Sequence, residues 1–386
     1  MSLAIHALQQ SFASCFGQRA TYHVRAPGRV NLIGEHTDYN DGFVLPCAID
    51  FSTHVLGRIN GSNRIRVVAA DYHQQWDDIL LDDAITHHGE YSWANYVRGV
   101  VLMLQSQGAA LVGCDLLISG NIPKGAGLSS SASLEVALGL MLSTIAGCAL
   151  SRLQLAKAGQ QAENRFVGCN SGIMDQLISA QGQPHHALLI DCRSLSATPV
   201  AFPREWALVI INSNVQRGLV GSEYNARRAQ CEAGAAHYGV GALRDLTPED
   251  IGDIAARLDD VTARRVRHVV TENCRTLQAA KALAHGDMAT MSQLMAQSHA
   301  SMRDDFAITV PPVDYLVTLV DSIVGSQGGV RMTGGGFGGC VVALMPVALI
   351  TEVKSQIATN YPKHSGLTAD VFVCQPAAGA EVVAQP

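Results

Sequence analysis

Residues 122–133 read Ile-Pro-Lys-Gly-Ala-Gly-Leu-Ser-Ser-Ser-Ala-Ser and run directly into an apolar segment at residues 134–150. Glycine has no Cβ, so Gly125 and Gly127 let the backbone approach a ligand closely. A helix that follows such a loop points its free N–H groups and the positive end of its dipole back into it, which suits phosphate. A serine hydroxyl there can also reach a magnesium ion carried by the phosphates. On these residues alone, a Gly/Ser loop that only starts a helix is an equal alternative.

A second stretch, residues 27–42, is dense in side chains that form hydrogen bonds. It leaves a short predicted strand at residues 22–26 and carries Arg29, Asn31, Glu35, His36, Asp38 and Asn40 between three glycines. This density suits a ligand with several hydroxyl groups, such as a sugar. A solvated turn is the alternative, but a turn rarely combines Arg, Glu, His and Asp around a Leu-Ile pair.

A third stretch, residues 333–340, places a glycine loop between two apolar runs. Gly334, Gly336 and Gly339 satisfy the G-x-G-x-x-G spacing of dinucleotide-binding proteins. That fingerprint requires a helix after the glycines, whereas here the strand-like residues 340–344 follow. We therefore reject a dinucleotide site. The G-x-x-x-x-G-K-[ST] loop and the protein-kinase signatures are absent from the sequence.

Composition narrows the class of protein. The chain has 386 residues, of which 48% are hydrophobic and 16% charged, and the length favours two domains. We place them at residues 1–200 and 201–386, divided near Pro199–Pro203. The net charge of −6 argues against binding of nucleic acid. Ten cysteines without a C-x-x-C pair argue against a zinc site and, with no signal peptide, for a cytoplasmic protein.

The periodicity of the chain predicts mixed helices and strands. Residues 134–150 contain Glu135 and are too short to cross a membrane, which needs about 20 apolar residues, so we expect a buried core helix. Ser151 and Gln154 predict a capping box for the next helix. Glu163 lies at the edge of the apolar face of that helix, either as a boundary residue or as a ligand. Ser171 is the expected N-cap of a short helix that carries Asp175 in its first turn.

Taken together, the three stretches resemble the motifs of the GHMP kinases. Residues 122–133 resemble the phosphate-binding motif of that family, and residues 333–340 resemble its C-terminal glycine motif. Residues 28–39 are similar to the signature of the galactokinases within it. The resemblance implies an α+β fold in which the active site lies in the cleft between an N-terminal βαβ-type domain and a ferredoxin-like C-terminal domain.

The resemblance also implies an activity. A galactokinase transfers the γ-phosphoryl group of MgATP to the anomeric hydroxyl of α-D-galactose, the first committed step of galactose use. ATP and D-galactose are the implied ligands and Mg²⁺ the implied cofactor. We expect no nucleic acid, membrane or obligate protein partner.

The motifs assign a role to individual residues. Asp175 would accept the proton of the sugar hydroxyl beside Arg29, and Ser131 and Glu163 would hold magnesium. The implied sugar-binding residues are Glu35, His36, Thr37, Asp38, Gly172 and Tyr224. The implied nucleotide-binding residues are Trp93, Gly125, Ala126, Gly127, Leu128, Ser129, Ser130 and Ser131.

Two alternatives share the same motifs. Some galactokinase-like proteins are sugar sensors without catalysis, and these lack a Ser-Ala pair within the serine run. The pair Ser131-Ala132 is present here and favours the enzyme. The identity of the acceptor sugar is also left open. N-acetylgalactosamine or arabinose is an alternative, because the size of the pocket near the 2-hydroxyl cannot be deduced from the sequence. Residues 35–38 favour unsubstituted galactose.

Overall fold

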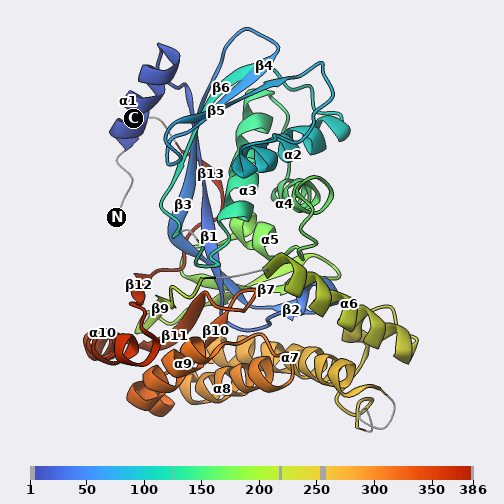
Figure 1. The fold of residues 1–386 in the computed structure, drawn as a ribbon, viewed down its shortest axis with the longest axis vertical. Coiled ribbons are helices and arrows are strands. Elements are labelled where there is room, and N and C mark those ends of the chain that lie inside the picture. Colours follow the sequence, from blue (N-terminus) through green and yellow to red (C-terminus); the bar gives the residue numbers. More distant parts are fainter. Residues whose placement is uncertain (1–4, 124, 217–219, 253–257, 384–386) are drawn as a thin grey trace.

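The computed structural model describes residues 5–123, 125–216, 220–252 and 258–383 (Figure 1). Lys124, part of the phosphate-binding motif, lies outside the described residues. The chain forms two halves, drawn one above the other in Figure 1, and each is built on its own main sheet.

The N-terminal half is a six-stranded sheet in the order β13-β1-β3-β6-β4-β5. Its strands are β1 (Tyr22–Asn31), β3 (Pro46–Ile59), β4 (Arg64–Ala69), β5 (Gln75–Leu80), β6 (Cys114–Gly120) and β13 (Glu381–Val382). Four helices cover one face: α2 (Ser92–Ser106), α3 (Ser130–Ile145), α4 (Arg152–Gln161) and α5 (Met174–Gln181). Helix α1 (Ile5–Phe16) covers part of the other face, where Phe12 packs with Leu56 and Leu117.

The C-terminal half is a four-stranded antiparallel sheet in the order β10-β11-β9-β12. Its strands are β9 (Trp206–Asn212), β10 (Gly329–Thr333), β11 (Cys340–Pro346) and β12 (Asp370–Cys374). The helices of this half are α6 (Val220–Tyr238), α7 (Asp260–His285), α8 (Met288–Asp304), α9 (Pro311–Val324) and α10 (Ile350–Ser365). A small sheet joins β2 (Phe43–Val44), β7 (His186–Asp191) and β8 (Ser196–Ala201).

The two halves share apolar packing. Strand β9 buries both of its faces, since Val209 packs in the C-terminal core while Ile210 packs with Val30 and Leu32 from the N-terminal half. Strand β13, near the end of the chain, returns to pair with β1. The division into residues 1–200 and 201–386 stays a prediction.

Several local predictions can be compared directly with the structure. The expected core helix is α3, but it begins at Ser130 and ends at Ile145, before Gly147 with its positive φ of 67°. The capping box at Ser151 and Gln154 is confirmed. The prediction that Ser171 caps the following helix is wrong, because α5 begins at Met174 after Ile173. Within the described ranges, no helix combines the length and apolar character that a membrane crossing requires.

Candidate active site

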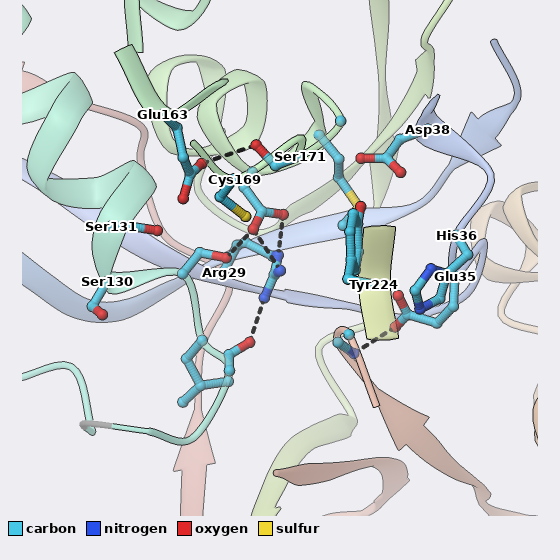
Figure 2. A pocket seen from close by; sticks show the side chains of 18 of the residues that line it. Arg29, Glu35, His36, Asp38, Ser130, Ser131, Glu163, Cys169, Ser171 and Tyr224 are labelled. Atoms are coloured by element: carbon cyan, nitrogen blue, oxygen red, sulfur yellow. Dashed lines mark hydrogen bonds and ion pairs between the residues drawn. The ribbon is translucent and has the colours of Figure 1, made fainter. Parts of the chain in front are cut away.

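A cavity of about 350 Å³ lies between the two halves, where α3, α5 and two loops converge. Figure 2 shows Glu163 and Ser131 toward one end of it, Glu35 and His36 toward the other, and Arg29 between them. Most of the predicted site residues line this cavity: Arg29, Glu35, His36, Asp38, Gly125, Gly127, Leu128, Ser129, Ser130, Ser131, Glu163, Gly172, Asp175 and Tyr224.

Three predicted site residues do not line the cavity. Ala126 is fully buried, although its loop borders the cavity. Thr37 is fully buried, and its hydroxyl lies 3.0 Å from the carbonyl oxygen of Gly34 and 2.7 Å from that of Phe43, so it braces its own loop. Trp93 stands at the start of α2, where its indole Nε1 donates to Gln75.

The phosphate loop (residues 125–131) leads into the N-terminus of α3. Gly125 and Gly127 take positive φ values of 71° and 76°, and Ser129, at the N-cap position of α3, lies in the left-handed region with a φ of 59°. The first N–H groups of α3 have no carbonyl partner within the helix and are free for an anion. The arrangement supports the phosphate-binding interpretation over a plain helix start.

Strand β1 contacts the backbone of the phosphate loop and fixes its position. A Cβ at Gly28 would lie 2.7 Å from the carbonyl oxygen of Leu128, so only glycine allows this approach. The next residue, Arg29, donates its backbone N–H to the same oxygen at 3.1 Å and its Nη1 to the carbonyl of Gly127 at 2.7 Å. The loop is therefore fixed by the strand that carries Arg29.

Asp175 lies in the first turn of α5, as predicted, and its carboxylate accepts hydrogen bonds from Arg29 and Ser129. Arg29 donates Nε to Oδ1 and Nη2 to Oδ2, both at 2.7 Å, and Ser129 donates its hydroxyl to Oδ2 at 2.5 Å. Burial works to lower the pKa of Arg29, but the charge and hydrogen bonds of Asp175, together with the charges of Glu35 and Asp38, outweigh it and the pKa is raised. A bidentate guanidinium pair of this kind fixes the orientation of the carboxylate as well as its charge.

Glu163 lies in a π-helical segment (Ala162–Val167) and lines the cavity. It is 7% exposed, and its Oε2 accepts from Ser171 at 3.0 Å and Gln176 at 2.9 Å. Burial, followed by the charge of Asp175, raises the pKa of Glu163. Among the described residues, no basic side chain forms an ion pair with it. A buried carboxylate that lacks a counter-charge, with the Ser131 hydroxyl beside it, is a donor set that fits a hard cation such as Mg²⁺.

The signature loop (residues 34–42) contacts strand β10 and the start of the C-terminal glycine motif through Glu35. Oε1 of Glu35 accepts from Arg331 at 3.1 Å, from the Thr333 hydroxyl at 3.0 Å and from the backbone N–H of Gly334 at 2.9 Å. Glu35 is 2% exposed and Arg331 is fully buried. The predicted sugar-binding acid is therefore held by residues far along the chain.

Two further side chains of the signature loop, His36 and Asp38, line the cavity together with Tyr224. The ring centroids of His36 and Tyr224 are 5.1 Å apart, and burial lowers the pKa of His36 to about 3, so this histidine is neutral. Burial, with the charge of Asp175, raises the pKa of Asp38 to about 7. A Cβ at Gly172 would lie 1.8 Å from Oδ2 of Asp38, so glycine is required opposite this carboxylate.

Sequence reasoning missed several residues of the site. Ser171, Cys169 and Gly335 line the cavity. Arg331 lies behind the cavity and forms an ion pair with Glu35. The one feature of the sequence that could have indicated this role is a charged residue between Val330 and Met332 in an apolar strand. Burial raises the pKa of the Cys169 thiol to about 11, so this cysteine stays protonated and is a poor nucleophile.

Comparisons with known proteins give the family of the chain. Three family models match: the galactokinase galactose-binding signature over residues 10–59, the GHMP kinase N-terminal domain over residues 95–183 and the GHMP kinase C-terminal domain over residues 279–363. A Lactococcus lactis galactokinase complexed with galactose is 34% identical over 98% of this chain and 100% of its own, with a TM-score of 0.94.

More distant structures share the fold. A Methanococcus jannaschii mevalonate kinase has a TM-score of 0.64 at 17% identity, over 92% of this chain and 99% of its own. A Streptococcus pneumoniae phosphomevalonate kinase in complex with phosphomevalonate and AMPPNP has a TM-score of 0.64 at 13% identity, over 94% of this chain and 99% of its own. The α+β GHMP-kinase fold that the motifs implied is confirmed.

Proposed function

This chain belongs to the galactokinases of the GHMP kinase family, and on that premise we propose how its residues pass the γ-phosphoryl group of ATP to the anomeric hydroxyl of α-D-galactose. One observation carries the proposal. Asp175, fixed by Arg29 and Ser129, lies in the same cavity as the anion-binding start of α3 and the polar signature loop.

The reaction is an in-line transfer. The anomeric oxygen forms a bond to the γ-phosphorus as the bond from that phosphorus to the β,γ-bridging oxygen breaks, and ADP leaves with the electron pair. The hydroxyl proton passes to a carboxylate oxygen of Asp175, and galactose 1-phosphate is the other product. Such transfers depend mostly on positioning and charge stabilisation, which Arg29 and the N–H groups of α3 supply. The proton acceptor adds about 10²–10⁴-fold in rate.

We assign the cation to Ser131 and Glu163. Mg²⁺ is usually held by one or two protein oxygens together with substrate phosphates, where it neutralises charge on the phosphoryl oxygens. Gln176 and Ser171 hold the Glu163 carboxylate on its Oε2 side. Glu163 thus has a fixed orientation toward the phosphate loop.

We assign galactose to the other end of the cavity. Glu35, Asp38 and neutral His36 offer acceptors and a donor to sugar hydroxyls there. Tyr224 and Gly172 complete the wall. A polar pocket of this type selects by the positions of hydroxyl groups, because an unpaired buried polar group is costly.

ADP release from MgATP by the purified protein tests the function directly. The acceptors are galactose, 2-deoxygalactose, N-acetylgalactosamine, glucose, arabinose, homoserine and mevalonate. Release that depends on galactose, with little for glucose, supports the proposal. Another preferred acceptor would overturn the sugar assignment and leave the phosphate site standing. Protection against heat by galactose without ADP release would indicate a sensor.

Galactose affinity is expected to depend on pH through Asp38. Because its pKa is raised to about 7, Asp38 loses its charge as the pH falls through that value, and it then accepts fewer hydrogen bonds from the sugar. Binding should therefore weaken below about pH 7 and release a proton near that pH. Isothermal titration in two buffers of different ionisation enthalpy measures both effects. The control is Asp38→Asn, which should show neither; a wild-type affinity that is constant with pH contradicts the prediction.

Gly172→Ala is expected to weaken galactose binding by about 10- to 100-fold and to leave nucleotide binding unchanged. The added methyl group forces Asp38 aside, at a cost typical of overpacking, about 1–3 kcal/mol. Gly89→Ala is the matched control, because a Cβ there meets no atom within 4 Å. Titration of each variant with galactose and with a non-hydrolysable ATP analogue makes the comparison. Equal galactose affinity in the two variants would show that Asp38 tolerates the displacement.

A further inference from the structure

Helix α7 belongs to the C-terminal half, yet its side chains bind the backbone of the signature loop. Oε1 of Glu272 accepts from the backbone N–H groups of Gly34 at 3.0 Å and Glu35 at 3.4 Å. One turn earlier on the same face, Nε2 of His268 lies 3.1 Å from the carbonyl oxygen of Glu35. Because a carbonyl only accepts, this nitrogen carries the proton. The first peptide units of the loop are thus held on both their N–H and C=O sides.

The same helix also holds the far end of the loop. Oδ1 of Asn273 accepts from the backbone N–H of Phe43 at 2.9 Å. The approach is close at both ends: a Cβ at Gly42 would lie 2.3 Å from that oxygen, and one at Gly34 would lie 3.0 Å from the Thr276 hydroxyl. A single helix therefore fixes the entry and the exit of the loop whose side chains face the cavity.

Glu272 is itself strongly held. It is fully buried, its Oε1 also accepts from the Ser298 hydroxyl at 2.6 Å, and its Oε2 accepts from Nε of Arg275 at 2.7 Å. Burial works to raise the pKa of Glu272, but the charge of Arg275 and other nearby basic groups outweighs it and holds the pKa at about 2. The carboxylate is ionised, and charge-assisted hydrogen bonds of this kind are roughly twice as strong as neutral ones.

None of His268, Glu272 and Asn273 lines the cavity. We infer that Glu272 and Asn273 of α7 are positioning residues for the sugar: they set galactose affinity by fixing the backbone of residues 34–43, without touching the ligand. The inference rests on the proposed sugar site. It follows from geometry, because Glu35, His36 and Asp38 all project from backbone that α7 anchors, and misplacement of a binding group by about 1 Å can cost 10²-fold.

Glu272→Gln tests the inference. The glutamine side chain has one acceptor oxygen, so either the loop N–H groups or Arg275 face an NH₂ group. We expect the galactose Kd to rise about 10- to 100-fold and the Kd of an ATP analogue to stay within about twofold. Two substitutions, Asn273→Ala and Ser298→Ala, each remove one hydrogen bond and keep the charge of Glu272. Each should raise the galactose Kd by about 3- to 10-fold, less than Glu272→Gln.

Asp259→Ala is the matched control. Asp259 caps the N-terminus of α7 through the N–H of Thr262, so its loss destabilises the same helix far from the loop. A purely structural role for Glu272 predicts that all these variants lower the melting temperature and leave the galactose Kd unchanged. That result would overturn the inference.

Hydrogen exchange separates this inference from the proposed function. The backbone amides of Gly34, Glu35 and Phe43 should exchange at least about tenfold faster in Glu272→Gln or Asn273→Ala than in Asp259→Ala, whichever sugar the wild-type protein binds. If the wild-type protein neither binds nor phosphorylates galactose, the proposed function is overturned and the inference that α7 fixes the loop is not. Unchanged amide exchange in both α7 variants overturns the role of the helix alone.

Discussion

Asp175→Asn is expected to lower kcat by about 10²–10⁴-fold, while ATP analogues bind with unchanged affinity. The side chain keeps its size, but the amide cannot accept the hydroxyl proton. Its NH₂ group also faces donors, because Arg29 and Ser129 both donate to the carboxylate in the native site. Steady-state and single-turnover rates with galactose, together with titration of a non-hydrolysable ATP analogue, measure the two effects.

Ser129→Ala is the control for that variant. It removes one of the three hydrogen bonds to Asp175 and leaves the bidentate pair with Arg29 intact, so we expect a loss in kcat below about tenfold. If Asp175→Asn retained a tenth of the wild-type kcat or more, Asp175 would not be the proton acceptor. Its role would then be limited to orienting Arg29.

The parts of the site that the sequence predicted are those with a local cause. Gly125 and Gly127 need positive φ, Asp175 follows a helix start, and Ser151 and Gln154 cap one another within a single turn. Each of these local features depends on neighbours a few residues away, whereas the roles expected of Gly125, Gly127 and Asp175 come from the resemblance to the GHMP kinases. The short strand expected at residues 22–26 was predicted for a similar reason and lies within β1 (Tyr22–Asn31), since the apolar pattern is a property of each strand by itself.

The position of Glu163 could not be predicted from helical periodicity. Its position at the edge of an apolar face assumed 3.6 residues per turn, but residues 162–167 are π-helical. The wider turn shifts the side chains that follow from the expected face and is common at functional sites. The structure places Glu163 at the cavity, and its role as a ligand stays a prediction.

The sequence did not predict the roles of three residues that contact the signature loop: Arg331, Glu272 and Asn273. Each acts on the signature loop from the other half of the chain, and no local pattern links an arginine in a strand to a glutamate in a loop near the N-terminus. Thr37 illustrates the converse. It stands inside the signature between His36 and Asp38, yet its hydroxyl serves the turn. A signature marks a loop, but tertiary packing decides which of its side chains reach the ligand.

Arg331→Met is expected to lower the free energy of unfolding by about 3–5 kcal/mol, the usual cost of removing one partner of a buried ion pair. Arg331 is fully buried, and among the residues that the structure describes Met leaves the Glu35 carboxylate with the neutral donors Thr333 and Gly334. Urea unfolding followed by tryptophan fluorescence measures the loss. A change below about 1 kcal/mol would show that the pair contributes little to the contact between the motifs.

The double variant Arg331→Met with Glu35→Gln separates stability from function. The glutamine introduced in place of Glu35 carries no charge, so the buried site no longer holds an unpaired ion, and part of the lost stability should return. Galactose binding should not return, because in the proposed site the carboxylate of Glu35 is the acceptor for a sugar hydroxyl. Recovery of both would mean that Glu35 acts only as a partner for Arg331. Recovery of stability alone would show that the Glu35 carboxylate serves both the fold, through Arg331, and the binding of the substrate.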